Sequence, residues 1–384
     1  MRVERFKWFA GATGVLTAVT LAVWWLPRGT GPAGARMVSS KAPAYSAALN
    51  TNNAGGAVAT AGELDARLRA TAADLANASD AAKRKHALAS LRQTLASRPA
   101  SEGSAAIRRF LDSKADAATH QGFKIGAKGF LSEAPSLRAF LLDYLGQIDP
   151  AAAAEYARVI LSSKDSPDEW AVALRNLATG DPSAGGRALL WQKAGEMLQY
   201  GPWQQSPSTG YLEAFDVAVF LGGTGLVPAL TELVRMQDNP AVAHAAYLAL
   251  DRLAIAEPAA LLGALEADPD LMQGREQTRA NYFARADVRD AQQRQVLESY
   301  LLDPRTSSQE LQQFAGLFPN ANYMVSQNLL TPTPTPDHAA LTSRDAASLQ
   351  AVQDWLADPR FASLQRPLQT VEQRLEDFAR QAGR

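Results

Sequence analysis

Two residues that could carry acid–base chemistry stand three positions apart in the middle of the chain. Glu213 and Asp216 lie in the otherwise apolar stretch 211–221 (YLEAFDVAVFL), which we expect to be one helix. If both carboxylates were buried and faced each other, the pKa of one would rise and it could act as a general acid. We favour the simpler interpretation that both lie on the single wet or cation-paired face of a largely buried helix.

The residue types that usually bind metals or form covalent intermediates show no pattern. The four histidines are scattered, without an HExxH motif, and we expect none of them to be a metal ligand; they are His86, His120, His244 and His338. The chain has no cysteine, which excludes disulfides, thiolate metal sites and thiol nucleophiles. No GxSxG motif supports nucleophilic hydrolysis. We therefore expect no metal, no cofactor and no enzymatic activity.

The glycine-rich run at 222–225 (GGTG) could offer backbone amides to an anion ahead of the helix that follows it. It lacks the Lys and Ser/Thr of a phosphate-binding loop, and it follows a predicted helix rather than a strand. We interpret it as a tight corner between two helices.

The segment 201–211 (GPWQQSPSTGY) is the strongest candidate for a binding surface. We expect an irregular loop there, and rigid aromatic side chains on loops are common binding anchors. The candidate residues are Trp203, Gln204, Gln205 and Tyr211. For Trp203 we favour the interpretation that it folds back onto the preceding helix near Trp191 and Tyr200 and belongs to the core.

Composition indicates which elements must position these residues. Ala, Leu, Gln and Arg are plentiful and β-branched residues rarely form runs, so local preference favours helix after about the first sixty residues. The net charge of −1 gives no reason to expect nucleic acid as a partner. The sequence predicts an all-α protein and does not indicate an oligomeric state.

Residues 60–330 read as a series of short amphipathic helices joined by corners. Five corners pair a capping residue with a proline; they are Asp149-Pro150, Asp181-Pro182, Asp238-Asn239-Pro240, Asp268-Pro269 and Asp303-Pro304. Two apolar stripes flank the third corner, formed by Leu226, Leu230, Leu233 and Val234 and by Val242, Ala246, Ala249 and Leu253. Neither helix can bury its stripe alone, so we expect antiparallel pairs stacked into an α-solenoid.

Residues 220–254 (FLGGTGLVPALTELVRMQDNPAVAHAAYLALDRLA) resemble a HEAT-type repeat. Residues 166–182 (SPDEWAVALRNLATGDP) resemble it more weakly. The resemblance implies an α-solenoid that binds partners, and it implies no reaction. Ala243 and His244 occupy the neighbourhood in which such repeats often carry Arg, so the usual interior Asp–Arg ladder is not indicated. Packing like that of tetratricopeptide repeats is the nearest structural alternative.

The chain after residue 330 has a different character. Residues 331–337 (TPTPTPD) favour extended polyproline geometry and are predicted to be a stiff spacer. Residues 338–384 carry two further apolar stripes separated by Asp358-Pro359 and are predicted to form a helical hairpin. We favour a cap over the last apolar face of the solenoid, and the alternative is a separate docking element.

The amino terminus carries the features of a membrane anchor. The uncharged run 8–26, within the predicted anchor 1–27, has Trp8 at one end and Trp24 and Trp25 at the other, and a helix of that length can cross a bilayer. The cationic cluster before it favours a cytoplasmic N-terminus. A signal peptide cleaved near 33–35 is the main alternative, and an ordinary buried helix a weaker one. Residues 28–59 are predicted to be a disordered tether.

These features together predict a protein of the cell inner membrane with its helical body on the periplasmic side. The expected function is that of a scaffold or adaptor that binds another protein or a peptide segment, with the bilayer as a second partner through residues 8–26. Two alternatives are an enzyme that uses the solenoid as a substrate cradle, with Glu213 and Asp216 as acid and base, and a purely structural spacer.

Overall fold

The computed structural model describes residues 61–333 and 338–382, all of which belong to one compact unit, residues 58–384. Within these described ranges no helix has the length and apolarity needed to cross a membrane. The predicted anchor 1–27, with Trp8, Trp24 and Trp25, and the tether 28–59 lie outside the described residues, as do residues 334–337 of the spacer.

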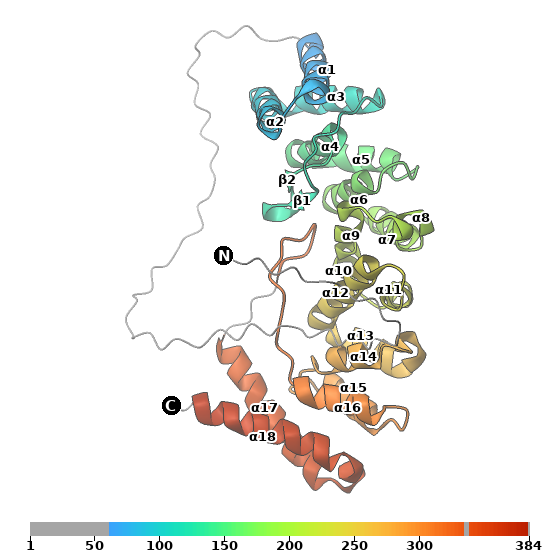
Figure 1. The fold of residues 1–384 in the computed structure, drawn as a ribbon, viewed down its shortest axis with the longest axis vertical. Helices are drawn as coiled ribbons and strands as arrows, with labels where there is room; N and C mark the ends of the chain where they lie inside the picture. The colour runs from blue at the N-terminus through green and yellow to red at the C-terminus, as the bar shows by residue number, and fades with distance from the viewer. Residues whose placement is uncertain (1–60, 334–337, 383–384) are drawn as a thin grey trace, which may run out of the picture. The chain divides into compact units, whose positions relative to one another are not determined.

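Helices dominate the described chain, as the sequence predicts (Figure 1). The first group of elements is α1 (Ala61–Asn77), α2 (Ala81–Ala96), α3 (Ala100–Asp112), β1 (Lys124–Ile125), η1 (Ala127–Gly129), β2 (Leu131–Glu133), α4 (Leu137–Ile148), α5 (Pro150–Ile160), α6 (Pro167–Gly180) and α7 (Ala184–Leu198). Short helices follow, α8 (Gly201–Gln205), α9 (Thr209–Glu213), α10 (Asp216–Leu221) and α11 (Val227–Val234). The last group is α12 (Pro240–Ala256), α13 (Pro258–Ala267), η2 (Pro269–Met272), α14 (Glu276–Phe283), α15 (Ala291–Leu302), α16 (Ser308–Leu317), α17 (His338–Ala357), η3 (Pro359–Leu364) and α18 (Gln365–Ala382).

The predicted corners are confirmed at helix ends. Asp149 and Asn239 cap the N-termini of α5 and α12, each followed by a proline in the first turn. Asp268 caps η2, whereas Asp181 and Asp303 stand at the ends of α6 and α15. A capping side chain satisfies an amide that the helix leaves free, and proline has no amide to satisfy, so this pairing fixes where each helix begins.

Neighbouring helices pack on one another along the described chain, so that α5 lies on α6, α11 on α12, α14 on α16 and α17 on α18. Both stripes predicted for the 224–254 pair are buried. One continuous hydrophobic cluster runs from Leu64 in α1 to Leu375 in α18. No single helix pair encloses a core of its own, and each pair depends on the next for burial.

Two segments depart from the predicted run of helices. Residues 113–136 contain no α-helix; they form a small antiparallel hairpin of β1 and β2, held by the bond from the Leu131 amide to the buried Asp143 carboxylate (2.9 Å). Glycines and a proline in this segment oppose helix, and Gly129 adopts a left-handed φ of +75°. The second departure is at the other end, where the repeat helices end at Leu317 rather than near residue 330.

After α16 the chain runs without helix or strand through residues 319–333, which we call the strap. Figure 1 shows the strap leaving α16 and returning past α12 and α10 towards the β1–β2 hairpin. The sequence analysis assigned most of this segment to the solenoid. Asn320, Asn322 and Pro332 instead favour extended backbone and turns.

The C-terminal helices α17 and α18 pack on each other, and α18 also packs on α16. Two partly buried arginines connect this pair to carbonyls of the repeat helices. Arg344 donates to the Arg285 carbonyl (2.6 Å) just past the end of α14, and Arg374 donates to the Ala315 carbonyl (2.7 Å) near the end of α16. A cation at the C-terminus of a helix satisfies carbonyls that have no partner within the helix.

Candidate functional site

The strap is held at its base by the end of α14. The Asn320 amide donates to the Ala284 carbonyl (2.6 Å), and Nη1 of Arg285 donates to the Asn322 carbonyl (2.6 Å). Arg285 is itself fixed by a two-pronged ion pair to Asp251 of α12, with distances of 2.7 and 2.8 Å. The backbone of the strap is therefore bound by the Arg285 side chain, whose orientation is fixed by Asp251 of α12.

The middle of the strap is held by Asp216, the first residue of α10. One oxygen of Asp216 accepts from the amides of Leu330 (2.7 Å) and Thr331 (3.0 Å). The other accepts from the Thr331 hydroxyl and from Nη1 of Arg252 (3.0 Å). The Asp216 side chain is only 1% exposed, and four donors with one ion pair compensate the burial of its charge.

The tip of the strap lies against the β1–β2 hairpin. Leu329 is buried, and its carbonyl carbon would lie 2.8 Å from a Cβ built on Gly129, with the carbonyl oxygen closer still. Only glycine admits so close an approach, and only glycine adopts the φ of +75° without strain. Arg175 of α6 donates to the Gly129 carbonyl (2.9 Å) from below and pairs with Asp143.

The strap also closes on itself. Oγ1 of Thr333 donates to the Ser326 carbonyl (2.7 Å), and the Asn328 amide group donates to the Thr331 carbonyl (3.1 Å). These bonds shape residues 326–333 into a loop whose tip presents Leu329, Leu330 and Thr331 to the helices. We call Gly129, Asp216 and Arg252, which receive this tip, the Asp216 cradle.

A ladder of ion pairs joins alternate helices: α4 with α6, α10 with α12, α12 with the end of α14, and α14 with α16. Its members are Arg138–Glu169 (2.8 Å), Arg175–Asp143, Arg252–Asp216 (3.0 Å), Arg285–Asp251 (2.7 Å) and Arg279–Glu310 (3.4 Å). Partners are 31 to 36 residues apart in sequence, close to one helix pair. The sequence did not predict this ladder, because Arg is usual at the positions that Ala243 and His244 occupy, whereas Arg252 and Arg285 supply the cations. The recurrent spacing of Asp and Arg was the available signal.

Burial also acts on two carboxyl groups near the strap. Burial raises the pKa of Glu213, and Asp216 adds to this rise while Arg252 opposes it. Burial likewise raises the pKa of Asp251, against the attraction of Arg285. Glu213 and Asp216 do not share one helix as predicted, because hydrogen bonds from residues 215, 217 and 218 to the third residue before them separate α9 from α10.

The predicted aromatic anchors are corrected by the structure. Residues 201–205 and 209–213 form the short helices α8 and α9 rather than a loop, and Trp203 (7% exposed) and Tyr211 (0%) are buried. Trp203 packs edge-on against Trp170, with ring centroids 5.2 Å apart, and against Tyr200 at 4.9 Å. Moving large aromatic rings out of water into the core stabilises the fold, so the core interpretation holds for Trp203.

The two glutamines of this segment take different positions. Gln204 uses its side-chain amide on the Leu198 carbonyl (2.6 Å), which ties α8 to the end of α7. Gln205 is exposed. The four predicted residues therefore do not form one surface.

The remaining candidates are the histidines and the glycine run. His86, His120 and His244 are exposed, and residues 61–333 and 338–382 contain no group of three or more His, Cys, Asp or Glu placed to hold a metal. The glycine run forms a corner, with φ near +68° at Gly222, and the Gly223 amide donates to the Glu257 carboxylate (2.7 Å). The anion at that corner is thus a side chain of the protein itself.

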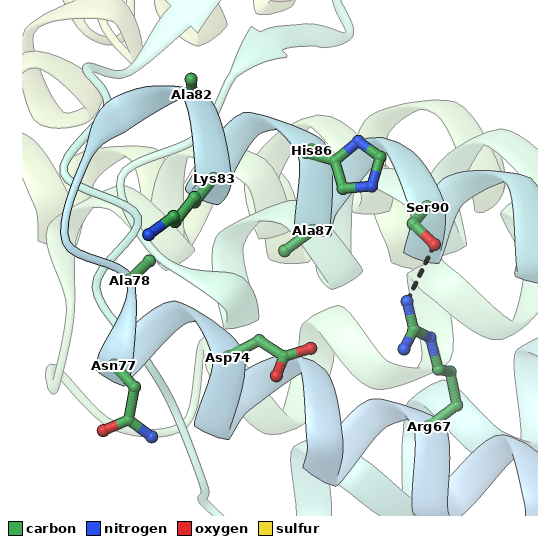
Figure 2. Close-up of a pocket in the computed structure, with 9 residues that line it drawn as sticks. All are labelled: Arg67, Asp74, Asn77, Ala78, Ala82, Lys83, His86, Ala87 and Ser90. Carbon is green, nitrogen blue, oxygen red and sulfur yellow. Dashed lines mark hydrogen bonds between the residues drawn. The ribbon is translucent and has the colours of Figure 1, made fainter.

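A shallow groove lies between α1 and α2 (Figure 2). It is lined by Arg67, Asp74, Asn77, Ala78, Ala82, Lys83, His86, Ala87 and Ser90. Arg67 donates to Ser90 (2.8 Å) at one end, so part of its polar lining is already paired. The mixture of cations, an acid and small side chains favours no particular class of ligand.

Comparison with known proteins finds no matching family model, no matching curated protein and no matching solved structure.

Proposed function

We propose that residues 61–382 are an α-solenoid of HEAT type that binds an extended segment of another protein on the helical surface now covered by the strap. The observation that supports this is the manner in which the strap is held. Arg285 and Asp216 grip carbonyl and amide groups of the strap backbone, which every peptide possesses. A helical-repeat surface that already holds one extended segment has the geometry to hold another.

The ion-pair ladder supports the same proposal. A charge buried at a repeat interface is fixed by its partner, so its remaining hydrogen-bonding capacity points in a constant direction. Arg285 and Asp216 each form further hydrogen bonds with the strap. Such preorganisation lowers the entropic cost of binding, because the receptor side chains need not become ordered.

We also propose that residues 8–26 anchor this module in the inner membrane with the helical body on the periplasmic side, where it acts as a scaffold or adaptor. The support is the uncharged run with tryptophans at both ends and the preceding cationic cluster. An anchor raises the effective concentration of the module near membrane partners. Protease treatment of intact spheroplasts tests the placement: cleavage within 61–382 is expected, and protection of that region would contradict it.

Catalysis by Glu213 and Asp216 is not part of the proposal. Both oxygens of Asp216 accept hydrogen bonds from the strap, and one of them also pairs with Arg252, so Asp216 has no free acceptor to offer a substrate while the strap is seated. Burial raises the pKa of Glu213, but no hydrogen bond among the described residues orients its carboxyl group. A general acid needs such a partner to hold its proton in line.

The proposal is tested by partner capture from solubilised membranes with the full chain. Arg252→Gln alters a ladder residue beside the strap, whereas Arg305→Gln removes a charge that is 64% exposed and pairs with Asp303. We expect Arg252→Gln to reduce recovery of the captured protein about 10-fold, equivalent to roughly 1.4 kcal/mol, while Arg305→Gln retains it. Thermal melts confirm that both variants are folded. Equal recovery with both variants would overturn the proposal.

A further inference from the structure

The tip of the strap is recognised in more detail than its base. Arg285 and Ala284 contact only backbone atoms of the strap. In the Asp216 cradle, Asp216 accepts hydrogen bonds from two successive amides and a hydroxyl of the strap, and Gly129 lies against a strap carbonyl. The cradle therefore distinguishes side chains, and the base does not.

We propose that the Asp216 cradle is a binding subsite for a segment of another protein that carries two apolar residues followed by Ser or Thr. Leu329, Leu330 and Thr331 of the strap are its resident occupant, which the partner segment displaces. This inference rests on the proposed function, because it assumes that the strap-covered surface binds peptides.

The chemistry of the cradle defines the sequence it accepts. The first position is buried as Leu329 is, so a charged side chain there loses its hydration without a partner. The hydroxyl of the third position donates to the Asp216 carboxylate. Valine at this position has no donor, and the negative charge of Asp or Glu would be repelled by Asp216. The carbonyl of the first position must fit directly against Gly129, where a side chain in place of the glycine hydrogen would block it.

The strap has the properties of a displaceable occupant. Between its base and its tip the chain is exposed, and Met324 (54%) and Val325 (79%) present large apolar side chains to solvent. Only Asn328 and Leu329 are buried. Two hydrogen bonds hold the base of the strap, but few contacts between the base and the tip oppose release of the tip, and a weakly held segment exchanges with a competitor. The strap competes with a partner, so weakening it must strengthen binding of a free peptide.

The test uses a fluorescein-labelled peptide with the sequence of residues 326–333 (SQNLLTPT) and the full chain in detergent. Thr331→Val weakens the strap without altering the receptor residues. We expect Thr331→Val to bind the peptide about 10-fold or more tightly than the unmodified protein, as the loss of a hydrogen bond to a charged group implies. The same peptide with Val in place of its first Thr binds about 10-fold less tightly.

A receptor variant and a matched control separate the cradle from general effects. Adding Asp216→Asn to Thr331→Val is expected to remove at least 10-fold of the peptide affinity. Asp354→Asn, an exposed carboxylate on α17 that pairs with Arg294, is expected to leave it unchanged. Circular dichroism and thermal melts establish that each variant is folded.

Hydrogen exchange gives a second readout that does not depend on any variant. An isotope-labelled peptide in excess is expected to expose the amides of Leu330 and Thr331, which Asp216 holds in the resting protein. Equal peptide affinity with and without Thr331→Val, or unchanged exchange at these amides, would overturn the inference. A dimer formed by exchange of straps, detected by light scattering, would also overturn it. If these tests fail while Arg252→Gln still loses its partner, the inference falls and the proposed function stands.

Discussion

The contact between Gly129 and the strap gives the sharpest prediction, because the chain contains a matched control. Gly129 and Gly274 both have a left-handed φ, of +75° and +76°. A Cβ on Gly274 meets no atom within 4 Å, whereas a Cβ on Gly129 would lie 2.8 Å from the Leu329 carbonyl carbon. Alanine at either position has the same left-handed strain, and only at Gly129 does it also expel the strap.

The expected losses of unfolding free energy follow from these two terms. Left-handed backbone costs an L-residue about 1 kcal/mol, which is the expected effect of Gly274→Ala. Release of the strap tip re-exposes Leu329, a fully buried leucine worth about 2 kcal/mol. We therefore expect Gly129→Ala to lower the free energy of unfolding by about 3 kcal/mol, with the difference between the variants arising from the strap.

Urea unfolding of the two variants measures the free energies, and hydrogen exchange of residues 326–333 locates the effect. Gly129→Ala is expected to expose the Leu330 and Thr331 amides, and Gly274→Ala is expected to leave them protected. Equal losses in the two variants, together with unchanged exchange in the strap, would refute the account of the strap tip as a bound segment.

Three further predictions concern the pKa shift, the C-terminal pair and the aromatic core. Because the pKa of Glu213 in the folded protein lies above 4.5, unfolding free energy falls as pH rises through that value, and Glu213→Gln is expected to raise the melting temperature at pH 7 but not at pH 4. Arg374→Met keeps the aliphatic stem but loses the bonds to the Ala315 and Phe318 carbonyls, which we expect to cost about 2 kcal/mol in urea unfolding and to make residues 338–384 susceptible to limited proteolysis. Trp203→Ala is expected to destabilise the fold by about 3–5 kcal/mol, measured by thermal unfolding, and wild-type stability would contradict its place in the core.

Local signals predicted the helices and their corners well. The Asp-Pro and Asn-Pro pairs mark helix ends because capping and the missing proline amide act within one turn, and the stripes of the 224–254 pair are buried as their period requires. The 113–136 hairpin was missed because it depends on a distant carboxylate, Asp143, that accepts the Leu131 amide. The break between α9 and α10 was likewise not predicted from the local sequence.

The candidate site was predicted less well, for a related reason. Asp216 was singled out correctly as a notable carboxylate, but its partners Leu330 and Thr331 are 114 and 115 residues away, and no local pattern links them. Trp203 and Tyr211 were candidate surface anchors because turn-forming residues surround them, but both are buried, and Trp203 packs against the rings of Trp170 and Tyr200 as the favoured core interpretation expects. Whether an aromatic ring lies outside or inside depends on tertiary neighbours, which composition does not reveal.

Hydrogen exchange at residues 328–331 of the full chain, measured with and without a saturating amount of the partner captured from membranes, tests the central claim most directly. If the partner takes the place of the strap, the Leu330 and Thr331 amides lose their protection while those in the middle of α12 keep theirs. Strap amides that stay protected in the partner-bound protein would contradict the claim that this surface is the binding site.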